Sequence, residues 1–219
     1  NFLGFGTMNG KDGKPFKTRN GDLLRLEYLI KDVEDAVYNK IKENRDVNDA
    51  EARATAKVVG LAAIKYGDLS NQASKDYIFD IDRFTSFEGD TGPYVLYTIV
   101  RIKSILNKYE QNFVAENLTI AERMKDFIAP EGASETDLCL LLTKFSDVIE
   151  SAYAELAPHK ICKFIYDVAN VFNSFYHDTK ILSEEDEKKR RSYIALISLT
   201  KGILETCTDL LAIKVPDRM

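Results

Sequence analysis

Apolar residues recur every three or four positions over most of this chain, and this spacing predicts amphipathic helices. Two such stretches come early, from about Glu27 to Glu43 and from about Asp49 to Tyr66. After residue 90 the pattern continues almost without interruption. The helices expected there span about 93–112, 118–128, 134–156, 158 to beyond 175, and 192–213. Five helices with short connections predict a helical bundle.

The first 83 residues differ in predicted secondary structure, because short extended pieces alternate with helices there. Residues 2–19 suggest strand, turn and strand, because Asn9-Gly10 and Asp12-Gly13 are turn formers. Residues 77–81 form a further short strand candidate. We therefore expect two regions, a mixed α/β segment over 1–83 and an all-helical domain over 84–219.

Composition narrows the class of protein. The chain has 219 residues, 45% hydrophobic and 30% charged, which is ordinary for a globular protein, and no apolar run is long enough to cross a bilayer. No signal peptide is expected, and the odd set of three cysteines suggests reduced thiols in a cytosolic protein. The net charge of −5 argues against nonspecific nucleic-acid binding, so any RNA site must be local.

A basic, glycine-containing loop over residues 11–21 is the first candidate for chemistry. Three lysines and one arginine crowd this turn-rich stretch, and such a loop can neutralise phosphate charge in a transition state. On composition alone a solvated hairpin tip explains the loop better.

Tyr94, Tyr97 and Arg101 form the second candidate, since they fall at positions i, i+3 and i+7 of one predicted helix. At 3.6 residues per turn they share one side, away from the apolar stripe of that helix. Two rings and a guanidinium suit a stacked, hydrogen-bonded nucleobase. The alternative is that the tyrosines cover a neighbouring helix with their hydroxyls in water.

A third candidate is a carboxylate set that lies just before the helical region and consists of Asp80, Asp82, Glu88 and Asp90. Helix capping and loop stabilisation explain these residues better than a magnesium site, and no metal is expected. His159 and His177 lie far apart with no nucleophile or carboxylate in catalytic spacing. Nucleophilic catalysis is therefore not expected.

Several longer stretches resemble arginyl-tRNA synthetases, in family order over nearly the whole chain. They are FGTM at 5–8 with GKDGKPFKTRNGD at 10–22, AIKYGDLS at 63–70, DYIFDID at 76–82, SFEGDTGPY at 86–94, ANVFNSFY at 169–176 and PDRM at 216–219. The stretch at 10–22 is similar to the one that replaces the KMSKS loop of other class I synthetases.

The resemblance implies a mainly α fold, in which a helical anticodon-binding domain follows the α/β-derived tail of a catalytic domain. It implies an enzyme that activates arginine with ATP and Mg²⁺ and joins it to tRNA(Arg). Lys17, Thr18 and Arg19 would lie in the loop that closes on the ATP phosphates. Tyr94, Tyr97, Arg101 and Met219 would surround an anticodon base. A cytoplasmic monomer without a bound cofactor or metal is expected.

Two departures limit what this polypeptide is expected to do alone. The basic loop lacks the Met-Ser-Lys order, and no HIGH-type motif occurs in the 219 residues. Since the chain also begins in what resembles mid-strand, a fragment without adenylation activity is expected. Three alternatives stay open: a free-standing helical RNA-binding or interaction module, a different class I synthetase, and a helical scaffold without RNA contact.

Overall fold

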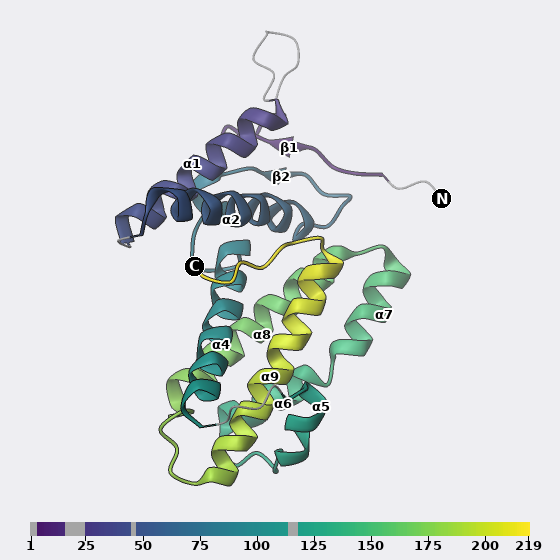
Figure 1. Ribbon diagram of the computed structural model, residues 1–219. Helices are drawn as coiled ribbons and strands as arrows, with labels where there is room; N and C mark the ends of the chain where they lie inside the picture. The colour runs from purple at the N-terminus through teal and green to yellow at the C-terminus, as the bar shows by residue number, and fades with distance from the viewer. Residues whose placement is uncertain (1–3, 16–24, 45–46, 114–117) are drawn as a thin grey trace.

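The computed structural model describes residues 4–15, 25–44, 47–113 and 118–219. Two long helices and a small sheet form a layer that lies across one end of a helical bundle (Figure 1). The layer contains β1 (Met8–Asn9), α1 (Leu26–Asn44), α2 (Asp49–Leu69), β2 (Tyr77–Ile78) and α3 (Ile81–Phe84). The bundle contains α4 (Gly92–Asn112), α5 (Ile120–Arg123), the 3₁₀ turn η1 (Met124–Asp126), α6 (Ala133–Leu142), α7 (Phe145–Glu155), α8 (Pro158–Asp178) and α9 (Glu187–Leu210). The predicted mainly α fold is confirmed.

The small sheet departs in part from the strand–turn–strand expected over residues 2–19. A turn does form, because the N–H of Gly10 donates to the carbonyl of Lys14 and Gly13 adopts a φ of 73°. The main partner of β1 is β2, however, in a parallel pair that aligns Met8 with Tyr77. Parallel strands need a long crossover connection, and here α1 and α2 provide it.

Both long helices of the upper layer bury one apolar face, although Leu61 of α2 remains exposed. In α1 the buried side chains recur at every fourth position, as Leu29, Val33, Val37 and Ile41. In α2 they are mostly alanines, and small side chains allow close helix packing against α1. Asn48 caps α2, since its side chain accepts a hydrogen bond from the N–H of Glu51 at 2.8 Å.

The first bundle helix, α4, begins where Thr91 caps it and Pro93 occupies its first turn. The predicted stripe of this helix is buried, and it consists of Val95, Ile99, Ile102 and Leu106. Packing of α4 on α2 requires a residue without a Cβ at the start of α4. A Cβ on Gly92 would lie 2.8 Å from the carbonyl oxygen of Ala62.

The single helix expected over 134–156 is wrong, because α6 ends at Leu142 and α7 begins at Phe145. The break lets α7 turn back along α8, where the rings of Phe145 and Phe164 lie 6.3 Å apart. Glu135 caps the start of α6. Its carboxylate accepts hydrogen bonds from the N–H groups of Glu131 and Gly132, and the helix begins at Ala133, one residue before the expected start.

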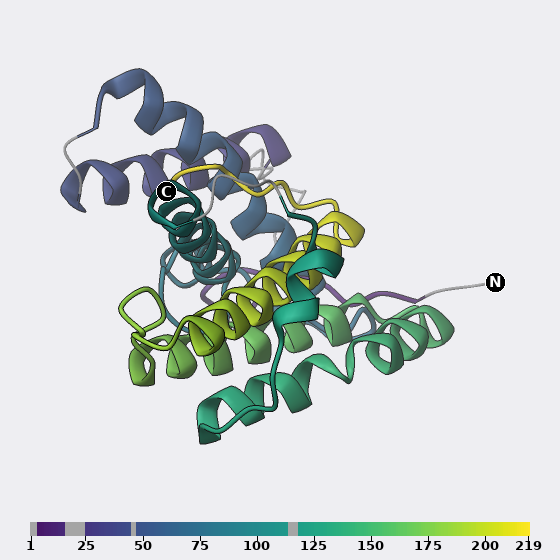
Figure 2. The ribbon, with the colours of Figure 1, turned by 60° about the horizontal axis from the view of Figure 1, so that its bottom comes forward.

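The last two helices complete the bundle, and α9 begins five residues earlier than expected. Asp186 caps it through the N–H groups of Lys188 and Lys189, so the charged run after 183 does supply an exposed helix start. With the lower end of the bundle turned forward, α8 lies between α9 and the pair formed by α6 and α7 (Figure 2). The shorter helix expected at 118–128 is α5 followed by η1.

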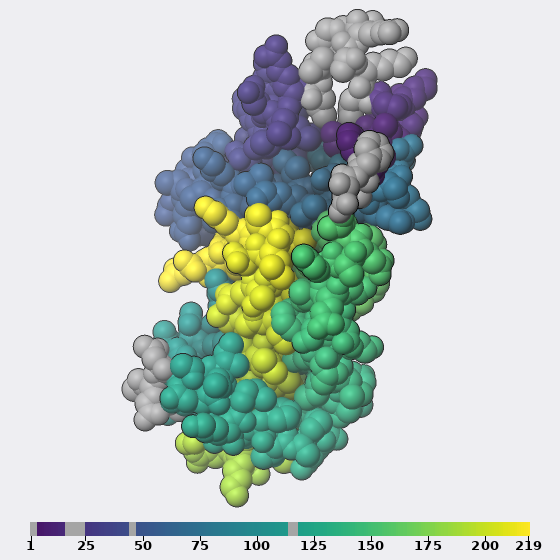
Figure 3. All heavy atoms as spheres, turned by 90° about the vertical axis from the view of Figure 1, so that its right-hand side faces the viewer, coloured from purple at the N-terminus to yellow at the C-terminus, as the bar shows by residue number. Residues whose placement is uncertain are grey.

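One buried apolar cluster joins the upper layer to the bundle, since it includes Val37 and Ala56 as well as Ile165 and Leu196. The C-terminal segment after α9 lies against the upper layer, where the space-filling view shows no gap (Figure 3). A second, smaller cluster of Leu29, Val33, Ala63, Phe79 and Phe84 lies under the sheet.

Candidate nucleic-acid interface

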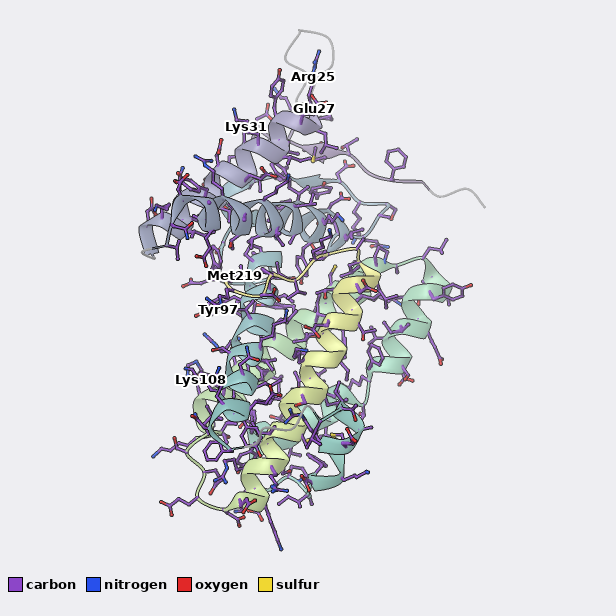
Figure 4. All side chains as sticks on the ribbon, viewed as in Figure 1. Arg25, Glu27, Lys31, Tyr97, Lys108 and Met219 are labelled. Atoms are coloured by element: carbon purple, nitrogen blue, oxygen red, sulfur yellow. The ribbon has the colours of Figure 1, made fainter. Side chains whose placement is uncertain are left out.

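A surface pocket lies where α4, α8 and the end of the chain meet. Its walls include Tyr97, Arg101 and Lys108 from α4, Tyr176 from α8, and Arg218 and Met219 from the C-terminal segment. Figure 4 shows Met219 beside Tyr97 at the junction with the upper layer and Lys108 further along α4. Folding therefore brings together three of the four predicted anticodon-binding residues.

Flat groups line the pocket. The guanidinium carbon of Arg101 lies 4.8 Å from the ring centroid of Tyr97 and 5.1 Å from that of Tyr176. Both rings remain more than one-third exposed. Cation–π attraction orients the guanidinium, yet the rings keep open faces on which another planar group can stack.

Tyr94 is the predicted residue that does not line this pocket. Its hydroxyl donates to the side-chain oxygen of Asn170 at 2.7 Å and accepts from the side-chain nitrogen of Asn173 at 2.9 Å. Asn173 in turn accepts a hydrogen bond from the Arg101 guanidinium. Tyr94 is thus bonded to α8, where it orients Asn173 and, through Asn173, Arg101.

The C-terminal segment is held in place by a lysine of α4. The Lys103 ammonium lies 3.4 Å from the carbonyl of Pro216, 3.5 Å from the Asp217 carboxylate and 3.6 Å from the Glu205 carboxylate of α9. Met219 is only 8% exposed and belongs to the main apolar cluster. The last residues thus form a fixed wall of the pocket.

The pocket is locally basic although the whole chain is acidic. Within the part of the chain that the structure describes, Arg101, Lys108 and Arg218 form no ion pair with a carboxylate. The one acidic side chain in the wall, Asp217, lies beside Lys103. Exposed rings can stack on a flat aromatic group, and cations without an ion-pair partner can bind an anion. A nucleotide has both an aromatic base and an anionic phosphate.

The basic loop of the sequence cannot be placed in the same way. Lys17, Thr18 and Arg19 lie outside the described residues. Lys11, from the same loop, lies 3.1 Å from the Asp80 carboxylate and 3.2 Å from that of Asp82.

The carboxylate set of residues 80–90 is dispersed over different contacts. Asp80 caps α3, as expected; its slight burial raises its pKa, but the Lys11 ammonium and backbone N–H groups hold that pKa below its usual value. Asp90 instead accepts a hydrogen bond from Tyr66. Among the described residues, no group of three or more histidine, cysteine or acidic side chains is arranged to hold a metal ion.

Comparison with known proteins decides the family. The model of the DALR anticodon binding domain matches residues 95–219, more than half of the chain. The chain belongs to this family. Residues 1–81 match the model of the catalytic domain of class I tRNA synthetases of the arginine type.

Relatives and solved structures agree with that assignment. The DALR-family chain is 63% identical to an arginine–tRNA ligase of Agathobacter rectalis and 54% identical to one of Alkaliphilus oremlandii. These matches cover 99% and 100% of the chain but 37% and 36% of the relatives, so it spans little more than one-third of their length. The arginyl-tRNA synthetase of Thermus thermophilus superposes over 99% of this chain and 35% of its own, with a TM-score of 0.81 and 25% identity. The resemblance inferred from sequence motifs is confirmed.

Four residues at or beside the pocket had no role in the sequence analysis, namely Tyr176, Asn173, Lys108 and Arg218. Lys108 follows Arg101 by seven residues, and this spacing could have placed it on the same helix face. Tyr176 and Asn173 come from α8 and reach the pocket only through folding.

Among the described helices, none is long and apolar enough to cross a membrane.

Proposed function

We propose that this chain recognises the anticodon of tRNA(Arg) as part of an arginine–tRNA ligase. The observation that carries the proposal is the pocket of Tyr97, Arg101, Tyr176 and Met219. An unstacked base would lie against the exposed rings, with the Arg101 guanidinium at its polar edge and Met219 as an apolar wall. Tyr94 would act on the base through Asn173 and Arg101.

A base in this pocket would gain specificity as well as affinity. Stacking on a tyrosine is tolerant of sequence, because every base has a flat face. Hydrogen bonds from a fixed guanidinium depend on where the acceptors of the base lie. The bonds that fix Arg101 to Asn173 and Asn173 to Tyr94 therefore support discrimination between bases.

The decisive experiment compares binding of this chain to a tRNA(Arg) transcript and to the same transcript with its anticodon replaced, at two salt concentrations. The native anticodon should bind more tightly, and Tyr97→Ala should remove that preference. Tyr153→Ala is the matched control, because Tyr153 is 83% exposed on α7, away from the pocket. Equal affinity for the two transcripts would overturn the proposal.

The complete ligase would use ATP and Mg²⁺ as substrate, with arginine, and would act in the cytoplasm as a monomer. Lys17, Thr18 and Arg19 would close on the ATP phosphates, although they lie outside the described residues. Since the 219 residues contain no HIGH-type motif, the chain by itself should not form arginyl-adenylate. Arginine-dependent ATP–pyrophosphate exchange by the purified chain would contradict this expectation.

A further inference from the structure

A polar stripe along the exposed side of α4 forms one wall of the pocket. Tyr97, Arg101, Ser104, Lys108 and Gln111 are spaced by three or four residues, and all five line the pocket. At a rise of 1.5 Å per residue, Lys108 lies about 10 Å beyond Arg101 along the helix. Figure 4 shows Lys108 on α4 beyond Tyr97, on the side away from the upper layer.

The fold makes no evident use of the Lys108 ammonium. Lys108 is exposed, and among the described residues it has no hydrogen bond or ion pair. The acidic side chain in the pocket wall is engaged elsewhere, because Asp217 lies beside Lys103. A side chain in this position remains free to bind an anion.

We infer that Lys108 binds the phosphate of a nucleotide next to the base held in the pocket, so that the RNA strand follows α4 away from the upper layer. This inference rests on the proposed function. Lysine is a compact charge with freely rotating donors, which suits a phosphate better than the edge of a base. The neutral donors and acceptors of Ser104 and Gln111 flank the same path.

The test measures the affinity of the chain for tRNA(Arg) transcripts over a range of salt concentrations. Lys108→Ala should weaken binding several-fold at low salt and reduce the slope of log K against log salt by about 0.7 to 1. The loss should be equal for native and replaced anticodons, because a phosphate contact carries no sequence information. Lys144→Ala is the control, since Lys144 is exposed at the junction of α6 and α7 and also lacks an ion pair among the described residues.

A second measurement locates the contact. Single methylphosphonates, which remove the charge of one phosphate, are placed along a synthetic anticodon stem-loop. At one position near the pocket base, the substitution should weaken binding by the unaltered chain but not by the Lys108→Ala variant. Circular dichroism should show that the variant is folded, because Lys108 has no structural contact to lose.

The outcomes separate this inference from the proposed function. Anticodon preference with an unchanged salt slope in Lys108→Ala would overturn the phosphate contact alone. A selective loss of preference in that variant would also overturn it, because Lys108 would then contact a base. Absence of anticodon preference in the unaltered chain would overturn the proposed function, and absence of all binding would overturn both.

Discussion

The side chain of Tyr66 is almost completely buried where the upper layer meets the bundle. Its hydroxyl lies 2.5 Å from the Asp90 carboxylate and 3.0 Å from the main-chain oxygen of Cys162 in α8. Burial, followed by the hydrogen bond to Asp90, raises the pKa of this hydroxyl far above its ordinary value. Tyr66 therefore remains neutral, and its hydroxyl lies where α2 meets the start of α4 and the second turn of α8.

Replacement of Tyr66 by phenylalanine tests this link. The ring would still fill its site, but the Asp90 carboxylate would lose the hydrogen bond that the hydroxyl donates. We expect the free energy of unfolding to fall by about 1–3 kcal/mol, measured by urea denaturation. Tyr109→Phe is the control, because Tyr109 is also buried and no hydrogen bond of its hydroxyl is present among the described contacts. An equal effect in both variants would contradict the role of the Tyr66 hydroxyl.

The three thiols should differ in reactivity. Burial raises the pKa of both Cys162 and Cys207 to about 12, whereas Cys139 is half-buried and its pKa is raised by burial and by Glu135. Because the thiolate is the nucleophile, iodoacetamide at pH 8 should modify Cys139 first and the other two only after unfolding. Mass spectrometry of the labelled peptides measures the order.

The same raised pKa values fix the direction of a pH effect on stability. Both thiols lose their protons near pH 9 in the unfolded chain but only near pH 12 in the folded one. Their contribution is therefore complete below pH 9 and is lost as pH rises toward 12. Replacement of both by alanine should flatten the decline of stability over that range, and an unchanged decline would contradict this account.

Contacts between whole helices depend on small residues at particular places. Gly92 opens α4 against α2, and an added Cβ would lie 2.8 Å from the Ala62 carbonyl oxygen and 3.0 Å from the Tyr66 Cβ. Neither atom is the free end of a flexible chain, so the helices would have to separate. In α9 the corresponding neighbour of Gly202 is the terminal methyl of Ile120, at 2.6 Å, and Ile120 is exposed and can move.

This difference predicts opposite results for two similar substitutions. Gly92→Ala should destabilise the chain by about 1–3 kcal/mol, because overpacking strains a well-packed contact. Gly202→Ala should be neutral or stabilising, since alanine is favoured over glycine by about 1 kcal/mol inside a helix. Thermal denaturation of the two variants measures both, and a more stable Gly92→Ala variant would contradict the packing argument.

At the scale of the whole molecule, the upper layer and the bundle share one core. The main apolar cluster contains residues of α1 and α2 together with residues of α4, α8 and α9. The domain boundary at residues 83–84 stays a prediction. Buried apolar side chains from both sides of this position belong to the same cluster. The C-terminal segment also connects the two parts, because Lys65 of α2 binds the carbonyl of Ala212.

We therefore expect the layer and the bundle to unfold together. Far-ultraviolet circular dichroism follows the helices, and tyrosine absorbance follows the side chains in a chain that has 11 tyrosines and no tryptophan. The two signals should give the same urea midpoint, as a single cooperative transition requires. Two separated midpoints would show that the layer and the bundle are independent units.

Local periodicity in the amino-acid sequence is enough to place several of the helices. The spacing of apolar residues and the capping residues predict α1, α2, α4 and α8, and they also predict the apolar stripe of α4. Both signals depend only on residues within about one helical turn of each other. The motifs of the family were equally readable, since they lie in contiguous stretches. Local spacing also predicts that Tyr97 and Arg101 lie on one face of α4.

Contacts between residues that are distant in the sequence could not be predicted in this way and became known from the packing of the helices. The break between α6 and α7 leaves both helices in contact with α8, and the parallel pairing of β1 with β2 joins residues about 70 positions apart. The pocket combines Tyr97 with Tyr176 and Met219, while Tyr94 is diverted into bonds with Asn170 and Asn173. The physical reason is that side-chain contacts between helices depend on how the helices cross, which no local spacing specifies.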